Sequence, residues 1–128
     1  MAVDESQINN VSHYDGDACM RAIEGLGAGK GFCLGSMIKY AWRGGKKASE
    51  GVAKDLSKAK WYFDRAISHN RLTVANSGDR DAVLEFGVLV GEQLKAHGDD
   101  EEVRSVCADL NVTIQKFLSE DTKRMRGF

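Results

Sequence analysis

A block of cations between residues 39 and 47 carries the clearest chemical signal in the sequence. Lys39 and Arg43 are four residues apart, so they share one face of a helix, and Lys46 and Lys47 follow a pair of glycines. Phosphate recognition needs clustered positive charge and forked donors, which arginine supplies best, while glycines let a ligand approach the backbone closely. We therefore predict that this block binds phosphate, and spacing alone leaves open a solvated basic helix face.

A second group of cations lies on the next predicted helix, together with a tryptophan. Lys54, Lys58, Trp61 and Arg65 are spaced at i, i+4, i+7 and i+11, which places them on one helical face, away from the predicted core. A tryptophan among cations on a polar face can stack on a nucleobase or fill a subunit interface. Both interpretations of Trp61 remain open at this point.

Asp55 is the acidic residue best placed to serve this basic region. Besides Glu50, it is the only acid near the start of the second cationic helix. Its carboxylate can hold a metal ion, act as a base, or pair with Lys39 or Arg43. No group of His, Cys and Asp residues has the spacing of metal ligands, so the sequence assigns no protein-held metal.

The glycine-rich segment 25–31, GLGAGKG, imitates a phosphate-binding P-loop but departs from the GxxxxGK[ST] pattern. Glu24 occupies the position of the first glycine, and Gly31 stands where the magnesium-binding hydroxyl should be. No strand is predicted before the segment. We therefore expect a glycine-rich connection between two helices.

Composition and charge narrow the class of protein. The chain has 128 residues, of which 42% are hydrophobic, and this is typical of one globular domain. Residues 30–65 hold nine basic and three acidic side chains, a balance of +6, whereas the rest of the chain has a balance of −7. The basic middle is a candidate anion site, and the acidic remainder argues against non-specific DNA binding.

The sequence predicts neither a membrane span nor a signal peptide, and its cysteines do not have the spacing of a disulfide framework. No apolar stretch approaches the roughly 18 residues of a membrane span, and the polar start lacks the apolar run of a signal peptide. The three cysteines, Cys19, Cys33 and Cys107, are scattered. We expect a reduced cytosolic protein without membrane contact, in which the cysteines are small buried apolar residues.

Apolar periodicity and the absence of proline predict an all-α fold, a compact bundle of about five helices. Trp42 belongs to the predicted apolar face of the second helix, and Asp79 is the predicted cap of the fourth. The segment 83–90 is apolar on nearly every side, so the fourth helix is central or buried against another subunit. The predicted helices cover residues 17–26, 32–43, 51–69, 79–98 and a last stretch that begins at 99–102.

The same pattern suggests three functional parts. Residues 1–12 form a polar lead-in, residues 13–70 a basic nucleotide-binding helical module, and residues 71–128 a helical hairpin. We assign packing and oligomerisation to the hairpin, because its apolar surface exceeds what a five-helix monomer can cover.

Three blocks in a fixed order resemble a known family. They are NNVSHY at 9–14, GFCLGSMIKYAWR at 31–43 and DLSKAKWY at 55–62. Over about residues 9–67 the chain resembles the phage-encoded family of unknown function that includes the small P-loop-less nucleotide kinase of short-tailed coliphages. Two positions depart from that pattern: Arg21 stands where the family often has an acid, and Ser36 where it often has asparagine.

The resemblance implies phosphoryl transfer from ATP or another nucleoside triphosphate, with Mg²⁺, to deoxynucleoside monophosphates of the dGMP and dTMP class. It further implies a homo-oligomer in the host-cell cytoplasm. Catalytic roles fall to Lys39, Arg43 and Asp55. Substrate binding falls to the other motif positions, which are His13, Tyr14, Tyr40, Lys46, Lys47, Lys58, Trp61 and Tyr62.

Two other functions compete with the kinase. The chain can be a non-enzymatic nucleotide-binding protein, such as a phage sponge for a signalling nucleotide, or a small interaction protein that inhibits a host factor. The basic, glycine-bearing middle favours the two nucleotide-binding hypotheses over the third. The kinase and the non-enzymatic binder differ in their need for a metal, because phosphoryl transfer needs a divalent ion. The scarcity of acids near the basic block therefore counts against the kinase.

Overall fold

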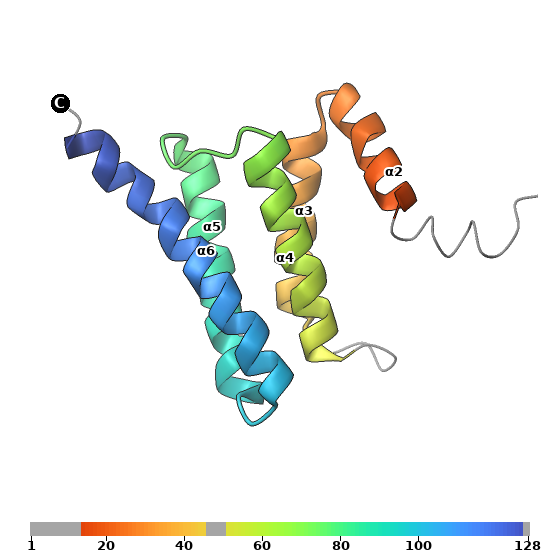
Figure 1. Cartoon of the computed structure of the whole chain (residues 1–128), viewed down its shortest axis with the longest axis vertical. Coiled ribbons are helices and arrows are strands. Elements are labelled where there is room, and N and C mark those ends of the chain that lie inside the picture. Colours follow the sequence, from red (N-terminus) through yellow and green to blue (C-terminus); the bar gives the residue numbers. More distant parts are fainter. Residues whose placement is uncertain (1–13, 46–50, 127–128) are drawn as a thin grey trace, which may run out of the picture.

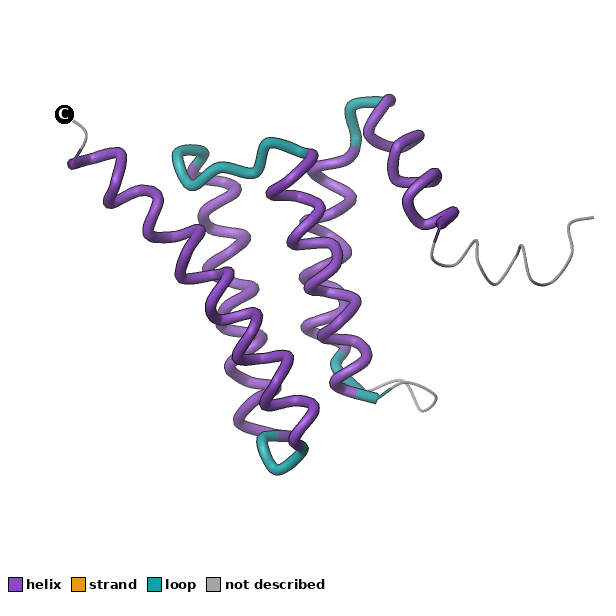
Figure 2. The backbone as a smooth tube through the Cα atoms, in the orientation of Figure 1, coloured by secondary structure: helices purple, strands orange, loops and turns teal. Residues whose placement is uncertain are grey.

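The computed structural model describes residues 14–45 and 51–126, and the side chains of residues 18–45 and 51–120. Within those ranges the protein is all-helical and has five helices and no strand, which confirms the predicted fold class (Figures 1 and 2). The predicted lead-in 1–12, His13, Lys46 and Lys47 lie outside the described residues. The helices are α2 (Tyr14–Gly25), α3 (Gly29–Arg43), α4 (Val52–His69), α5 (Ser77–His97) and α6 (Glu101–Arg126).

Two helical hairpins build the bundle. α3 and α4 pack side by side, as do α5 and α6, and the hairpins meet through α3 against α5 and α4 against α6 (Figure 1). α2 packs on α3 at one end of the bundle and otherwise stands apart from the hairpins. The hydrophobic core is continuous across both hairpins, so residues on either side of the predicted boundary at 70 share one interior.

The core stripe of α3 differs from the predicted one. Cys33, Met37 and Ala41, spaced by four residues, are fully buried, whereas Trp42 is 61% exposed. The prediction that Trp42 belongs to the apolar face is therefore wrong. Each residue advances a helix by about 100°. Trp42 therefore lies beyond the edge of the stripe that ends at Ala41.

The glycine-rich connection is shorter than predicted, because Gly29 already opens α3 and only residues 26–28 separate it from α2. A Cβ at Gly29 would clash with the side chains of Asn70 and Glu24. Glycine therefore lets the start of α3 press against the end of α4. α2 likewise begins earlier than predicted, at Tyr14, and ends at Gly25.

A polar network fastens α2 to the hairpin of α3 and α4. Arg65 of α4 donates to both carboxylate oxygens of Glu24, at 2.8 and 3.0 Å, and the Asn70 amide donates to the same carboxylate at 2.7 Å. These contacts lower the pKa of Glu24, with the hydrogen bond from Arg65 as the largest cause. α2 therefore covers the end of the polar face of α4 on which Arg65 lies.

The start of α5 is capped by a residue other than the predicted one. Asn76 is the N-cap, and its side chain accepts a 3.0 Å hydrogen bond from the backbone N–H of Asp79. The Asp79 side chain is buried and instead accepts from Lys30 Nζ at 2.9 Å and from the Thr73 N–H at 3.1 Å. Asp79 thus joins the start of α3 to the start of α5.

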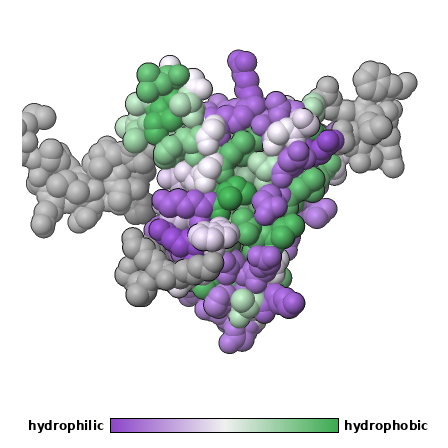
Figure 3. Space-filling view, turned by 180° about the vertical axis from the view of Figure 1, so that it is seen from behind, coloured by the Kyte–Doolittle hydropathy of each residue, from purple (hydrophilic) through white to green (hydrophobic). Residues whose placement is uncertain are grey.

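The middle of α5 is only partly enclosed. Val83, Phe86 and Val90 are fully buried, but Leu84 and Val88, four residues apart, are 47% and 54% exposed. The single chain therefore does not enclose this helix completely, and the predicted burial against another subunit stays a prediction. From the side of α3 and α5, apolar surface runs through the middle of the molecule (Figure 3).

The cysteines divide into two classes. Cys33 and Cys107 are fully buried, as predicted, but Cys19 on α2 is exposed. Burial is the largest cause that raises the pKa of Cys33, to about 11, and burial also raises the pKa of Cys107. The prediction of three buried cysteines is thus wrong for Cys19, because α2 packs along only one side.

Candidate functional site

Three cations surround one aromatic ring where α3 and α4 face each other. The ring is that of Tyr40, and its centroid lies 4.7 Å from Arg43 Cζ, 5.1 Å from Lys39 Nζ and 5.5 Å from Lys58 Nζ. An aromatic face attracts cations within about 6 Å of its centroid. Tyr40 therefore offsets part of the repulsion among the three cations, and Tyr40, Tyr62 and these cations are named here the cation–aromatic cluster.

Aromatic rings from both α3 and α4 pack beside Tyr40. Tyr62 stacks on Tyr40, with centroids 5.9 Å apart and planes 9° apart. Phe32 and Trp61 each meet Tyr62 edge to face, at 5.8 and 5.1 Å. Burial raises the pKa of Tyr62. Because one face of Tyr40 is occupied by Tyr62 and cations lie over the ring, Tyr40 positions the cations and has little surface left for stacking on a ligand.

Asp55 of α4 is a buried acid that holds Arg43, one of the three cations, in place. Its side chain is fully buried, and it accepts from Arg43 Nη2 at 2.8 Å and from the backbone N–H of Gly45 at 3.1 Å. Burial by itself raises the pKa of Asp55, but the hydrogen bonds from Arg43 and Gly45 outweigh it, so the net pKa is lowered. Of the roles that the sequence left open for Asp55, the structure shows pairing with Arg43.

The glycine turn that follows α3 is tightly held. Gly45 has φ +73°, a conformation that favours glycine, and a Cβ there would clash with the Val52 side chain. A Cβ at Gly44 would clash with the amide of Gln93, which donates to the Ala41 carbonyl at 2.8 Å. This turn therefore touches α4 through Asp55 and α5 through Gln93.

Most of the predicted site residues that the structure describes come together. The two blocks separated in sequence, around Lys39 and around Lys58, meet across the interface of α3 and α4. Tyr14 is the first residue of α2, with its side chain outside the described set, and His13, Lys46 and Lys47 lie outside the described residues. The predicted site residues that meet are Lys39, Tyr40, Arg43, Asp55, Lys58, Trp61 and Tyr62.

The described acidic and histidine side chains do not form a site for a magnesium ion. No group of three or more His, Cys, Asp or Glu residues within the described ranges is arranged to hold a metal. Asp55, the nearest acid to the cations, uses both carboxylate oxygens on Arg43 and Gly45.

A cavity of about 380 Å³ lies between the ends of α3 and α5, and sequence reasoning missed it. We call it the turn pocket. Its lining combines an exposed aromatic ring, two glycines, a carboxylate and an amide. The spacing of Trp42 predicts a core position, and Glu92 belongs to none of the sequence motifs, so the sequence does not predict this pocket. The lining residues are Trp42, Gly44, Gly45, Leu89, Glu92, Gln93, Ala96 and His97.

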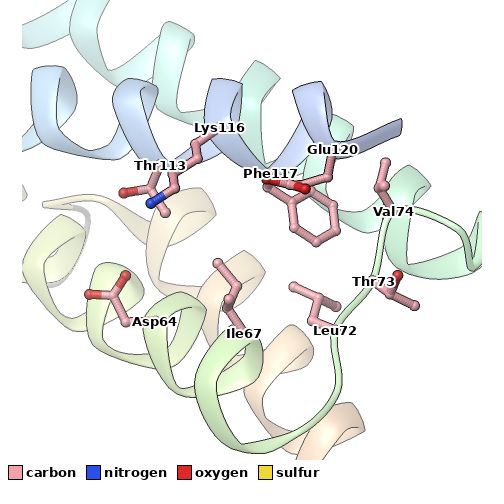
Figure 4. Close-up of a pocket in the computed structure, with 9 residues that line it drawn as sticks. All are labelled: Asp64, Ile67, Leu72, Thr73, Val74, Thr113, Lys116, Phe117 and Glu120. Atoms are coloured by element: carbon pink, nitrogen blue, oxygen red, sulfur yellow. The ribbon is translucent and has the colours of Figure 1, made fainter. Parts of the chain in front are cut away.

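A larger cavity, of about 520 Å³, opens between α4, α6 and the connection that leads to α5 (Figure 4). Its floor is apolar, and its rim carries Asp64, Lys116 and Glu120. The Asp64 carboxylate is engaged by Lys60 Nζ at 2.7 Å. None of the predicted site residues that the structure describes lines this cavity, so it is separate from the cation–aromatic cluster.

Comparison with known proteins gives one family and no named relative. Residues 8–64 match a family described as protein of unknown function (DUF3310). The match confirms the resemblance to a phage-type family of unknown function. It covers the cation–aromatic cluster but not α5 or α6. No curated protein and no solved structure matches the chain.

No helix within the described part of the chain is long and apolar enough to cross a membrane.

Proposed function

We propose that the cation–aromatic cluster binds the phosphates of a nucleotide, and that the protein is a nucleotide kinase without a P-loop. The observation that carries the proposal is the convergence of Lys39, Arg43 and Lys58 on one ring, above a buried carboxylate. Like charges held this close are stabilised further by an anion, and an exposed lysine beside a fixed arginine suits phosphate oxygens.

The proposed reaction follows the activity that the family resemblance implies. A phosphate oxygen of a deoxynucleoside monophosphate attacks the γ-phosphorus of a nucleoside triphosphate such as ATP. The bond from the γ-phosphorus to the β–γ bridging oxygen breaks, and the products are two diphosphates. Positive charge that is already in place stabilises the charge on the transferring group without reorganisation. Lys39 and Lys58 would supply it directly, and Asp55 would act as a positioning residue through Arg43.

A second candidate is a nucleotide-binding protein without turnover. It is favoured by one observation, that the described residues provide no acidic cluster for a metal and that Asp55 is already engaged. Such a protein would use the same phosphate-binding cations. The two candidates therefore share the cluster and differ only in whether product forms.

The deciding experiment combines binding and turnover. The protein is incubated with ATP, Mg²⁺ and each deoxynucleoside monophosphate, and products are separated by chromatography, while calorimetry measures binding of each monophosphate without ATP. Diphosphate formation supports the kinase, and binding without product supports the alternative. Absence of both binding and product would refute the nucleotide-binding proposal.

Two lysine variants test the cluster without disturbing the core. Lys39→Ala and Lys58→Ala each remove one charge-assisted contact, so nucleotide affinity should fall by about tenfold. The matched control is Lys60→Ala on the same helix as Lys58, because Lys60 pairs with Asp64 outside the cluster. Arg43→Ala is a poorer test, because it also strips the buried Asp55 of its partner. Affinities of Lys39→Ala and Lys58→Ala equal to that of Lys60→Ala would refute the assignment.

We also propose that the chain forms a homo-oligomer, in the host-cell cytoplasm, through the outward side of α5. Leu84 and Val88 form an exposed apolar pair there, one helical turn apart. Burial of such a pair against another copy would remove it from water. Light scattering that gives a monomer mass across micromolar concentrations would refute association.

A further inference from the structure

The larger cavity, between α4 and α6, has the size of a small-molecule site. Such sites are concave, of roughly 300–1,000 Å³, and combine apolar surface with a few polar groups that fix orientation. This cavity measures about 520 Å³, and we call it the α4–α6 cavity. The connection that leads to α5 closes one side of it (Figure 4). A space closed in this way suits a small ligand better than a partner helix, which would have to run through it.

The floor of the α4–α6 cavity is apolar and comes from three parts of the chain. Ile67 belongs to α4, Leu72 and Val74 to the connection, and Phe117 to α6. Leu72, Val74 and Phe117 are at most 7% exposed, and Ile67 is 38% exposed. Apolar surface that lines an open cavity remains in contact with water, so an apolar ligand group that displaces this water binds favourably.

Hydrogen bonds fix the wall of the cavity in place. The Leu72 N–H donates to the Ala66 carbonyl at 3.2 Å, and the Thr73 N–H donates to the buried Asp79 at 3.1 Å. Arg71, between α4 and this wall, has φ +55°, a left-handed conformation that is uncommon outside glycine. Because the wall is already ordered, a ligand does not have to order it on binding.

The rim carries opposite charges on one face of α6. Lys116 and Glu120 are four residues apart, the same spacing at which Lys60 and Asp64 of α4 form an ion pair of 2.7 Å. Among the described side chains, no ion pair joins Lys116 to Glu120 or to another residue. Both are exposed, with Asp64 on α4 across the cavity (Figure 4). The rim therefore offers an ammonium and a carboxylate to a ligand.

A ligand that matches this lining carries two opposite charges beside an apolar body. Its ammonium can donate to Glu120, and its carboxylate can accept from Lys116. In an amino acid both groups are bonded to one carbon, so they can bridge two side chains one helical turn apart, whose Cβ atoms are about 6 Å from each other. A ligand with a single charge would satisfy only one of the two.

We propose that the α4–α6 cavity binds a free apolar amino acid of the size of leucine or phenylalanine. Its side chain lies on the apolar floor, and its ammonium and carboxylate pair with Glu120 and Lys116 at the rim. The site shares no residue with the cation–aromatic cluster, so this inference does not depend on the proposed function.

The main test is calorimetry of the unmodified chain with L-phenylalanine and L-leucine. Phenethylamine lacks the carboxylate, hydrocinnamate lacks the ammonium, and L-alanine lacks the large apolar group. Both large amino acids should bind saturably. Phenethylamine and hydrocinnamate should bind about fivefold more weakly than L-phenylalanine, since an exposed ion pair contributes modestly, and L-alanine should bind least. Equal affinity for L-phenylalanine and for both of its singly charged analogues would overturn the recognition of an amino acid.

Rim variants locate the ligand. Lys116→Met and Glu120→Gln should each weaken L-phenylalanine binding by about fivefold. The matched controls are Lys95→Met and Glu102→Gln, because both side chains are exposed and neither lines the cavity. Rim variants that bind like their controls would overturn the placement.

A cavity-filling variant tests the floor. Ile67→Trp places a larger side chain at a partly exposed position of the lining, so binding of L-phenylalanine should be lost while the helical circular-dichroism signal is kept. Normal binding by a folded Ile67→Trp protein would overturn the site, and if this variant does not fold, the rim variants decide. Absence of binding of both large amino acids up to about 10 mM would overturn the proposal as well, and would leave the nucleotide-binding proposal untouched.

Discussion

The hairpin of α3 and α4 and the hairpin of α5 and α6 are built on different principles. In the first, charged groups pair across helices, as between Arg43 of α3 and the buried Asp55 of α4, and Arg65 of α4 also pairs with Glu24 of α2. In the second, α5 and α6 meet through apolar side chains, and α5 leaves Leu84 and Val88 exposed. The family match ends at residue 64, within the first hairpin. The first hairpin, which carries the proposed site, therefore depends on polar contacts between helices, whereas the second depends on apolar packing.

The largest expected effect comes from the apolar hairpin. Leu89 is 7% exposed in the core, so Leu89→Glu loses its packing and buries an unpaired carboxylate. We expect a loss of about 5 kcal/mol or more, comparable with the whole stability of a small domain, and hence loss of the helical circular-dichroism signal. A folded Leu89→Glu protein would contradict the packing of α5.

Val88→Glu is the matched variant, because Val88 is the adjacent residue and is 54% exposed. It should melt within about 0.5 kcal/mol of the unmodified protein, since exposed substitutions cost little. If copies associate through α5, Val88→Glu should reduce the mass seen by light scattering. An unchanged oligomer would place the interface elsewhere.

The next largest effect tests the polar hairpin. Asp55→Ala removes the buried partner of Arg43, whose side chain is 21% exposed, and removes the acceptor of the Gly45 N–H. Breaking a buried ion pair by removing one partner costs about 3–5 kcal/mol. Urea denaturation should show that loss, and a Tm unchanged from the parent would indicate that the pair contributes little.

Acid should weaken the same hairpin. Because the folded pKa of Asp55 lies below the usual value of 3.8, its contribution is fully present above that value and is lost as pH falls through the folded pKa. Glu24 shifts in the same direction, from a usual value of 4.5. The stability difference between the parent and Asp55→Asn should therefore shrink as pH falls below about 4, in denaturation curves measured at several pH values. A constant difference down to pH 2 would contradict the lowered pKa.

The smallest effect concerns the start of α5. Asn76→Ala removes the N-cap that accepts from the Asp79 N–H and should cost about 1 kcal/mol, measured by thermal melting. Asp79→Ala should cost more, because the buried Asp79 carboxylate also holds Lys30 and the Thr73 N–H. Equal losses would mean that capping is the main role of both residues.

The helices and the general location of the cation–aromatic cluster were predictable from the sequence, because each depends on local periodicity. Lys39 and Arg43 must share a face whenever the segment is helical. Partners across helices were not predictable in the same way. Whether Asp55 meets Arg43, Lys39 or a metal depends on how α4 returns along α3, and Glu24 meets Arg65 across 41 positions.

Residues at the edge of an apolar or capping pattern were harder to predict than partners across helices. Trp42 is one position beyond a buried alanine, so an apolar periodicity includes it although the packed helix exposes it. Asn76 and Asp79 are both good caps by residue type, and only the path of the connection into α5 decides between them. The turn pocket joins residues about 50 positions apart, a juxtaposition that no local spacing encodes.

The difference in exposure among the three cysteines allows a fluorescent dye to be attached at a single position. With Cys33 and Cys107 fully buried, a thiol-reactive fluorophore will attach at Cys19 alone, without any engineered substitution. Cys19 lies on α2, which packs on α3, so the dye would be attached next to the helix that carries Tyr40 and Lys39. Its emission would report, in a single labelled sample, when a ligand reaches the cations or when α2 moves away from α3.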